Sequence, residues 1–329
     1  MKRNTSTRKP SEPRAHHFVP QCWLAGFTET GEKEGKLWVS DLGRAKQWPT
    51  NPANAGHSRD FYRLSDPRLD PLVVENTFSK IETDIAPLLK AIDQELHKPT
   101  DDELEVLVWF IAIQWVRVPS FRPKVLMIEE SVFRSQLFRD LQTPESWAAA
   151  LKQAHIPADS PGAEYEAVRE FVHSKHYTLK AENEWYVHQA FQAANRIAPL
   201  LMDRHWEISF SKSGNYIASD SPVALDGPQG GMIGFKNAEI VTYPVSRHAL
   251  LYGTKVPVKP PLVSLKSIAH WNTFAMLTAE AQVYSHRPDF CWLDELGRYQ
   301  TNWNSFAKEK FEKTFDNPDH RFDLTARTP

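Results

Sequence analysis

The sequence predicts an α+β fold: a mostly helical single domain with a small antiparallel sheet. Two observations predict it. Apolar residues recur at helical spacing from about residue 70 to residue 202, whereas short alternating segments and turn residues dominate from about 205 to 255. Helices and strands are therefore separated along the chain, which is typical of an α+β fold and not of alternating βαβ units.

Composition limits the class of protein. The chain has 329 residues, of which 41% are hydrophobic, and a formal net charge of -2. A sizeable core is expected, and the balance is not that of a protein that coats nucleic acid. Two distant cysteines argue against a disulfide framework, and no stretch approaches the roughly 18 apolar residues of a membrane span. A cytoplasmic protein without a membrane partner is expected, and its oligomeric state stays open.

The N-terminal part mixes several short elements. Residues 1–15 are basic and polar, with no apolar run of a secretory signal, and are expected to form a flexible arm before a single domain over 16–329. Residues 19–27 show helical spacing, 36–42 alternate as a strand does, and 48–64 are expected to form a loop.

The helical part is predicted from periodicity and caps. Residues 72–96 form a long amphipathic pattern with a kink expected near Pro87. Thr100 followed by Glu103 is a capping-box signature, and the apolar helix that it opens should end before Pro119. Further helices are expected over the ranges 124–141, 144–154, 162–174 and 181–202.

The strand-rich part begins with a hairpin pattern over residues 205–225, where a Ser-Gly-Asn turn separates two segments of strand type. One or two more strands are expected within 238–253. The pattern returns to helix from about 263, and 290–300 resemble a strand and a turn.

His16 and His17 stand side by side before a proline, and two interpretations remain open. Histidines in such a place can bind a metal or act as a general base, or they can simply begin a helix. The pair is also similar to the first half of a His-Me finger nuclease. That fold needs an Asn and a further His on a following hairpin and helix, and the nearest candidates, Asn51, Asn54 and His57, lie in the expected loop.

Charged and amide side chains on the two main helices form the second candidate group. Glu75 and Glu82 are seven residues apart and share a helix face, so they can be metal ligands, an acid/base pair or a solvated stripe. Gln114 and Arg117 lie on the most apolar helix. A buried Arg needs a carboxylate or a phosphate, because an unpaired buried charge is too unfavourable. Arg122 follows as a second candidate for an anion clamp.

Two later residues complete the candidates. Asp220 lies at the end of a predicted strand before a proline, a position used by catalytic residues and by turn formers alike. Asn272 lies on a helix and can bind a ligand or a neighbouring backbone group. The chain has no Walker loop and no GxGxxG, HExxH, GxSxG or CxxC motif, so P-loop enzymes, nucleotide-cofactor oxidoreductases and Ser hydrolases have no support.

The motifs occur in an order that resembles one family. They are "HHFVPQCWLAGF", "LWVSDL", "DFY", "VENTFSKIE", "FIAIQWVRVPSFR", "YIASDSPV", "YPVSRHALLYG" and "WNTFAMLTAEAQVYS". Over roughly residues 16–287 the chain is similar to the domain of unknown function 4238, found mostly in bacteria. The resemblance implies a single-domain architecture and no particular reaction. It marks the polar residues His17, Glu75, Glu82, Gln114, Arg117, Asp220 and Asn272 as part of the family pattern, with the first histidine corresponding to His16 or His17.

Three functions follow as hypotheses. The first is a metal-dependent hydrolase of a phosphate ester, such as a nuclease, with nucleic acid or a nucleotide as partner. In it His16 or His17 is the base or a ligand, Arg117 and Arg122 clamp phosphate, and Gln114 and Asn272 assist. Its metal ligands are His17, Glu75, Glu82 and Asp220, an oxygen-rich set that favours Mg or Mn over Zn. The second is a non-catalytic binding protein with a structural polar network. The third is a toxin or phage-defence component of undetermined chemistry, which no residue supports directly.

Overall fold

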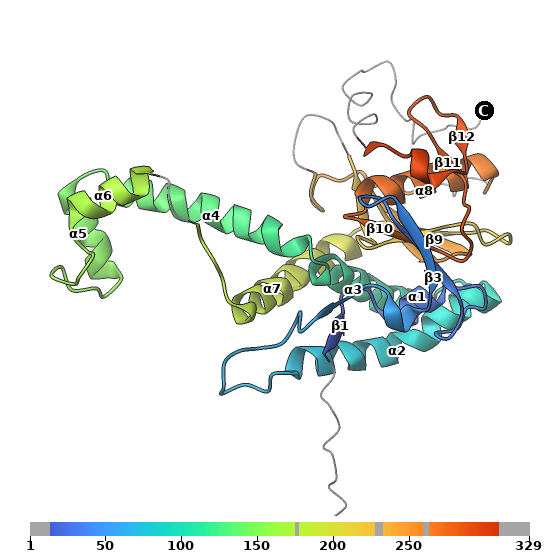
Figure 1. The fold of residues 1–329 in the computed structure, drawn as a ribbon, viewed down its shortest axis with the longest axis horizontal. Coiled ribbons are helices and arrows are strands. Elements are labelled where there is room, and N and C mark those ends of the chain that lie inside the picture. The colour runs from blue at the N-terminus through green and yellow to red at the C-terminus, as the bar shows by residue number, and fades with distance from the viewer. Residues whose placement is uncertain (1–13, 175–177, 228–232, 259–262, 309–329) are drawn as a thin grey trace, which may run out of the picture. The chain divides into compact units, whose positions relative to one another are not determined.

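The computed structural model describes residues 14–174, 178–227, 233–258 and 263–308 (Figure 1). The chain divides into two compact units, the first made of residues 1–118 and 190–329 and the second of residues 119–189. Helices occur together with several antiparallel sheets, so the α+β class is confirmed. Whether the two units behave as one domain stays a prediction.

The second unit is helical. It contains α4 (Phe121–Asp140), α5 (Pro144–Gln153), α6 (Tyr165–Ser174) and the first residues of α7 (Asn183–Met202). Thr143 opens α5 through a capping box with Ser146, whose backbone N–H donates to the threonine hydroxyl. These helices lie within a few residues of the predicted ranges.

Two long helices of the first unit carry the candidate residues Glu75, Glu82, Gln114 and Arg117. They are α2 (Val73–Glu95), which continues through the exposed Pro87, and α3 (Asp101–Arg117). The predicted capping box is confirmed, because Thr100 accepts from the Glu103 backbone N–H and Glu103 accepts from the Thr100 N–H. The two helices contact each other, and the buried side chains Phe78, Ile85 and Leu107 lie in the core.

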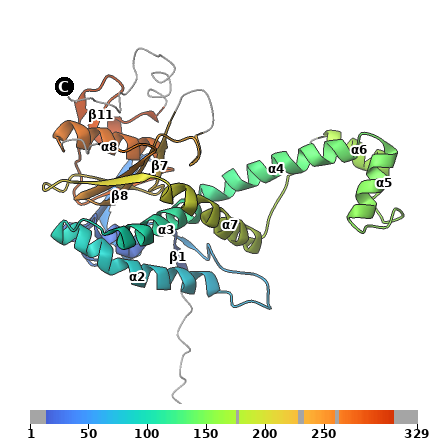
Figure 2. The ribbon, with the colours of Figure 1, turned by 180° about the vertical axis from the view of Figure 1, so that it is seen from behind.

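The larger sheet of the first unit has the order β5-β9-β8-β7, and its strands are β5 (His205–Phe210), β7 (Ala224–Asp226), β8 (Ile240–Ser246) and β9 (Ala249–Thr254). Helix α2 contacts β8, and α8 (Leu265–Thr278) contacts β7, so the sheet lies between these helices (Figures 1 and 2). The short α1 (Gln21–Ala25) packs on α2 and β8.

The second four-stranded sheet joins distant segments in the order β3-β2-β10-β6. Its strands are β2 (Leu37–Asp41), β3 (Lys46–Thr50), β6 (Ala218–Ser219) and β10 (Gln282–Ser285). The predicted hairpin over 205–225 is therefore wrong. Strand β5 pairs with β9 and β6 pairs with β10, because the turn at Gly214 leads the chain out of one sheet and into the other.

Two short strand pairs and two 3-10 turns complete the described part of the first unit. The strand pair β1 (Ala15–His17) and β4 (His57–Arg59) is antiparallel, β11 (Trp292–Leu293) pairs with β12 (Tyr299–Gln300), and two 3-10 turns cover Pro52–Asn54 and Trp303–Ser305. Part of the loop expected over 48–64 is thus regular structure. The predicted arm over 1–15 lies mostly outside the described residues and stays a prediction, while Ala15 belongs to β1.

Candidate functional site

The candidate site is built around Arg117 in the last turn of α3. Its side chain is buried, with 2% of the residue exposed. Arg117 Nη2 donates to the His17 carbonyl at 2.5 Å and to Glu82 Oε1 at 2.9 Å, and Cζ lies 4.4 Å from the centre of the Phe78 ring. The sequence predicts a carboxylate or a phosphate beside a buried Arg, and the carboxylate of Glu82 on α2 is such a partner.

Glu75 and Glu82 flank this guanidinium from α2, where a spacing of seven residues puts both on one face. Both are half-buried. Burial raises the pKa of Glu75 to about 7; nearby Arg117 lowers this pKa and nearby Glu82 raises it. The Glu75 carboxyl therefore exchanges a proton near neutral pH, as a general acid or base must.

Unsatisfied polar atoms gather at the same place. Gln114, one helical turn before Arg117, is fully buried. Within the described residues neither its amide oxygen nor its amide nitrogen has a hydrogen-bond partner, and the same holds for Arg117 Nε and Nη1 and for Glu75 Oε2. Buried polar groups are nearly always bonded, so these atoms suit a polar ligand or ordered water. We call Glu75, Glu82, Gln114 and Arg117 the Arg117 cluster.

His17 borders the cluster through its backbone carbonyl, while its ring is engaged elsewhere. Nε2 lies 3.2 Å from the Ala53 carbonyl oxygen and Nδ1 lies 3.4 Å from Gln21 Nε2, a pattern that fits a neutral ring donating through Nε2. Burial, together with the nearby His57, lowers the pKa of His17 to about 4. A ring whose two nitrogens are both bonded presents no free lone pair to a metal.

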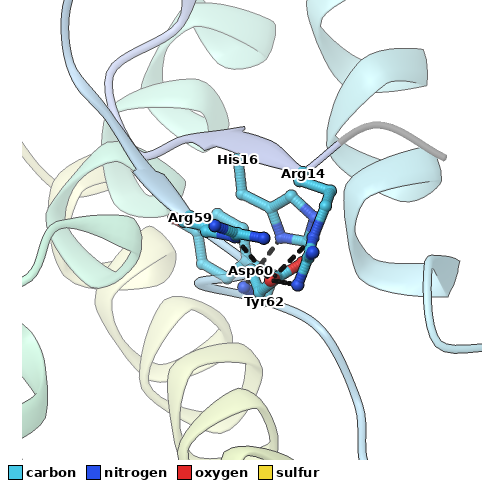
Figure 3. A network of polar contacts seen from close by, with 5 residues as sticks. All are labelled: Arg14, His16, Arg59, Asp60 and Tyr62. Atoms are coloured by element: carbon cyan, nitrogen blue, oxygen red, sulfur yellow. Dashed lines mark hydrogen bonds and ion pairs between the residues drawn. The ribbon is translucent and has the colours of Figure 1, made fainter. Parts of the chain in front are cut away.

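His16 is fully buried in a second network, drawn in Figure 3. Its Nδ1 accepts the backbone N–H of Tyr62 at 2.9 Å, and next to it Arg14 holds Asp60 through two nitrogens (Figure 3). The Tyr62 hydroxyl donates to the Arg117 carbonyl oxygen. The two histidines therefore lie in strand β1 and not at a helix start, because Pro20 is the residue that precedes α1.

The candidates for the His-Me finger alternative lie beside this strand. Asn54 donates its side-chain N–H to Asn51 Oδ1 across a 3-10 turn, and His57 stands opposite His17 in β4. The His17 and His57 rings are 5.2 Å apart between centres. A His-Me finger needs the Asn and the further His on a following hairpin and helix. Here Asn54 lies in a 3-10 turn and His57 in strand β4.

Asp220 and Asn272 are bonded outside the Arg117 cluster. The Asp220 carboxylate accepts the backbone N–H groups of Glu280, Ala281 and Gln282 at 2.8 to 2.9 Å. Burial raises the pKa of Asp220 to about 6, although these three bonds lower it. Asn272 accepts the Ile217 N–H and donates to two backbone carbonyls. In this structure both side chains hold neighbouring backbone segments in place.

Arg122 belongs to the second unit, whereas Arg117 belongs to the first. Arg122 Nη1 donates to Asn183 Oδ1 at 3.0 Å, and its guanidinium lies 5.1 Å from the centre of the Tyr186 ring. The structure describes each unit by itself, so the expected clamp of Arg117 with Arg122 stays a prediction.

Three aromatic residues around the cluster were not predicted from the sequence. They are Tyr62, Phe78 and Tyr243, the last of which is fully buried, with burial raising its pKa well above the usual value and no bond to its hydroxyl from a described residue. Tyr243 also stacks on Trp23 at 5.5 Å. The motifs "DFY" and "YPVSRHALLYG" contain the two tyrosines, but nothing in the local sequence distinguishes them from core aromatics.

The expected metal ligands are only partly brought together. Glu75 and Glu82 share the cluster, His17 contributes its carbonyl there, and Asp220 binds backbone elsewhere. Across the described ranges, no group of three or more His, Cys, Asp or Glu side chains is arranged to hold a metal ion. A divalent cation at this place would depend on two carboxylates, water and substrate oxygens, which is a usual environment of Mg²⁺.

Comparison with known proteins adds the family. The sequence model described as protein of unknown function (DUF4238) matches residues 15–289. Neither the curated proteins nor the solved structures gave a match. No single helix among the described residues has the length and apolar character to cross a membrane.

Proposed function

The chain belongs to the DUF4238 family, and we propose that it is a hydrolase of phosphate esters that works at the Arg117 cluster. One observation carries the proposal: the unbonded nitrogens of Arg117 and the unbonded amide of Gln114 lie buried beside a carboxyl group, Glu75, that has no hydrogen-bond partner on Oε2. Guanidinium and amide N–H groups are the donors that bind phosphate oxygens in proteins.

The roles follow from the geometry. Arg117 Nε and Nη1 bind the non-bridging oxygens of the phosphoryl group, and Gln114 adds an amide donor. Glu82, already 2.9 Å from Arg117, orients the guanidinium. Glu75, with a pKa of about 7, removes a proton from the attacking water or gives one to the leaving alcohol. Glu75 and Glu82 are half-buried, so both side chains keep some contact with solvent.

A divalent cation remains part of the hypothesis. Two carboxylates and a phosphoryl group repel each other, and Mg²⁺ or Mn²⁺ relieves such repulsion while it binds substrate oxygens. Among the predicted ligands, Glu75 and Glu82 fit this role in the described structure, whereas the His17 ring and Asp220 already have other partners.

The test is hydrolysis of p-nitrophenyl phosphate, bis(p-nitrophenyl) phosphate, and single- and double-stranded DNA, each with Mg²⁺, Mn²⁺ or chelator. Glu75→Gln is expected to lower kcat by roughly 10²- to 10⁴-fold, the usual contribution of a general acid or base. Gln114→Leu should lower activity without unfolding the protein, since it removes an unbonded buried amide. Asp84→Asn, an exposed carboxylate of the same helix, is the matched control and should be neutral.

One specific observation favours a second function, a binding protein in which the cluster is structural. Arg117 joins the His17 carbonyl to Glu82, and Tyr62 holds the Arg117 carbonyl, so β1, α2, α3 and the segment after β4 are tied together. If no phosphate ester is turned over, and Gln114→Leu and Glu75→Gln only raise the melting temperature, this second function is the correct one.

A further inference from the structure

A separate cavity lies in the first unit where α1, α2 and the end of β8 meet. Its volume is about 80 Å³. Its apolar walls include Trp23, Leu89 and Val245, and Asp93 of α2 lines it as well. The proposed hydrolase chemistry uses none of these residues.

Asp93 is a buried carboxylate without a full set of partners. Only 4% of the residue is exposed, and no described residue forms a hydrogen bond with its Oδ1. Burial raises the pKa of Asp93, while a hydrogen bond from Ser246 and the charges of Arg247 and His248 lower it. An ionised carboxylate in such a place is strongly unfavourable unless a donor or a cation joins it.

The loop between α1 and β2, which contains Gly31, packs closely against the Asp93 carboxylate. Gly31 has φ +75°, and a Cβ at this residue would stand 2.7 Å from Asp93 Oδ2 and 3.2 Å from Gln94 Nε2. Glycine is therefore required twice, for the left-handed backbone and for the close approach.

Three charged residues line the cavity from its exposed side. Lys90 and Glu32 form an ion pair at 2.7 Å, and Gln94 also donates to Glu32 at 3.2 Å. Lys33 is exposed, lines the cavity and makes no ion pair with the described part of the chain. The cavity thus presents one carboxylate oxygen without a described partner, Asp93 Oδ1, and an exposed lysine, Lys33, without an ion pair to a described residue.

We propose that this cavity binds a small free amino acid, its ammonium group on Asp93 and its carboxylate on Lys33. Asp93, through its free Oδ1, and Lys33 have the signs of charge that a zwitterion needs. The volume agrees with this size of ligand. A cavity needs roughly 10–15 Å³ to hold one water molecule, so about five to eight waters would fit here. Glycine, alanine and serine have a similar number of non-hydrogen atoms. The apolar walls accept a short side chain.

The experiment is isothermal titration of the full chain with L-alanine, glycine and L-serine, with n-propylamine and propionate as probes of one charge each. Binding of the amino acids is expected, at affinities near the millimolar range, and each single-charge probe should bind at least about tenfold more weakly. Asp93→Asn and Lys33→Met should each weaken alanine binding at least about tenfold. Asp84→Asn, an exposed carboxylate on the same helix, should leave it unchanged.

A filling variant covers the case in which Asp93→Asn does not fold. Ala86→Leu adds side-chain volume to the cavity wall on α2, keeps both charges and should abolish binding. The proposal is overturned if none of the amino acids binds at about 10 mM, if Ala86→Leu binds as the wild type does, or if n-propylamine binds as tightly as alanine. Since none of these variants alters the Arg117 cluster, the outcome is independent of the phosphate-ester hydrolase.

Discussion

At the scale of single residues, Arg117 is a buried charge of the first unit. Its guanidinium is buried and paired with Glu82. Replacing Arg117 with Met should lower the free energy of unfolding by roughly 3–5 kcal/mol, because the partner carboxylate is then left without its cation. Urea unfolding of Arg117→Met, Glu82→Gln and the double variant measures this. The double variant should lose less than the sum of the two single losses, and additive losses would contradict direct pairing.

Glu75 should make stability depend on pH. Its pKa is raised to about 7 in the folded protein, against an ordinary value of 4.5, so the folded state binds the proton more tightly than the unfolded chain does. The resulting stability is fully present below about pH 4.5 and is lost as the pH rises through 7. Glu75→Gln should therefore match the wild type near pH 4.5 and exceed it near pH 8, by about 1–2 kcal/mol after allowance for solvent screening of a half-buried group.

Urea unfolding from pH 4.5 to pH 8 measures the difference, with Asp84→Asn as the control on the same helix. A gap between Glu75→Gln and the wild type that stays constant across this range would show that Glu75 does not titrate there. The same series serves the hydrolase hypothesis, because the pH at which activity changes should follow this pKa.

At the scale of elements, a capping box stabilises the start of α3, the helix that carries Gln114 and Arg117. Thr100 and Glu103 satisfy each other's backbone N–H groups at that start. Thr100→Ala should cost about 1 kcal/mol, the usual value for a lost N-cap. Thr83→Ala is the matched control, since its hydroxyl bonds the Ser79 carbonyl within α2 and caps nothing. Equal losses in thermal unfolding of the two variants would contradict a capping role.

Helices were predictable from the sequence, but the pairing of strands was not. The capping box, the proline at 119 and the apolar periodicity are local signals, and α2 and α3 match them. The partners of a strand are not local. Residues 205–225 have the pattern of a hairpin, yet their two strands join different sheets, since β6 pairs with Tyr284 and Val283 some 65 residues later. No short window of sequence contains that information.

The candidate site shows the same division. Glu75, Glu82 and Arg117 were predictable because one helix face and the cost of a buried charge are enough to bring them together. From the sequence, Asp220 could not be assigned either as a catalytic residue or as a turn former, because both roles place an Asp at a strand end. The backbone N–H groups of residues 280–282 donate hydrogen bonds to its carboxylate, and these partners are known only from the fold.

At the scale of the whole molecule, added metal tests whether the proposed hydrolase depends on a divalent cation. A cation that binds only the folded protein raises its stability by about 2.7 kcal/mol at 100-fold over Kd. Melting curves of chelator-treated protein with Mg²⁺ or Mn²⁺ should shift upward, and Glu75→Gln should remove the shift. Asp220→Asn should keep the shift even if it lowers the starting temperature. If neither metal moves the wild-type curve, metal dependence is wrong and a metal-free acid–base reaction remains.

Strand β10 has a consequence for the time course of synthesis. It lies between β2 and β6, so Ser40 meets its partner Val283 only after about 240 further residues have been made. At roughly 5–20 residues per second, a ribosome needs about 12 to 50 s for that length. During this interval β2 has β3 on one edge and no final partner on the other. The nascent chain therefore carries an open sheet edge until residues 282–285 emerge, and such an edge can pair with another chain.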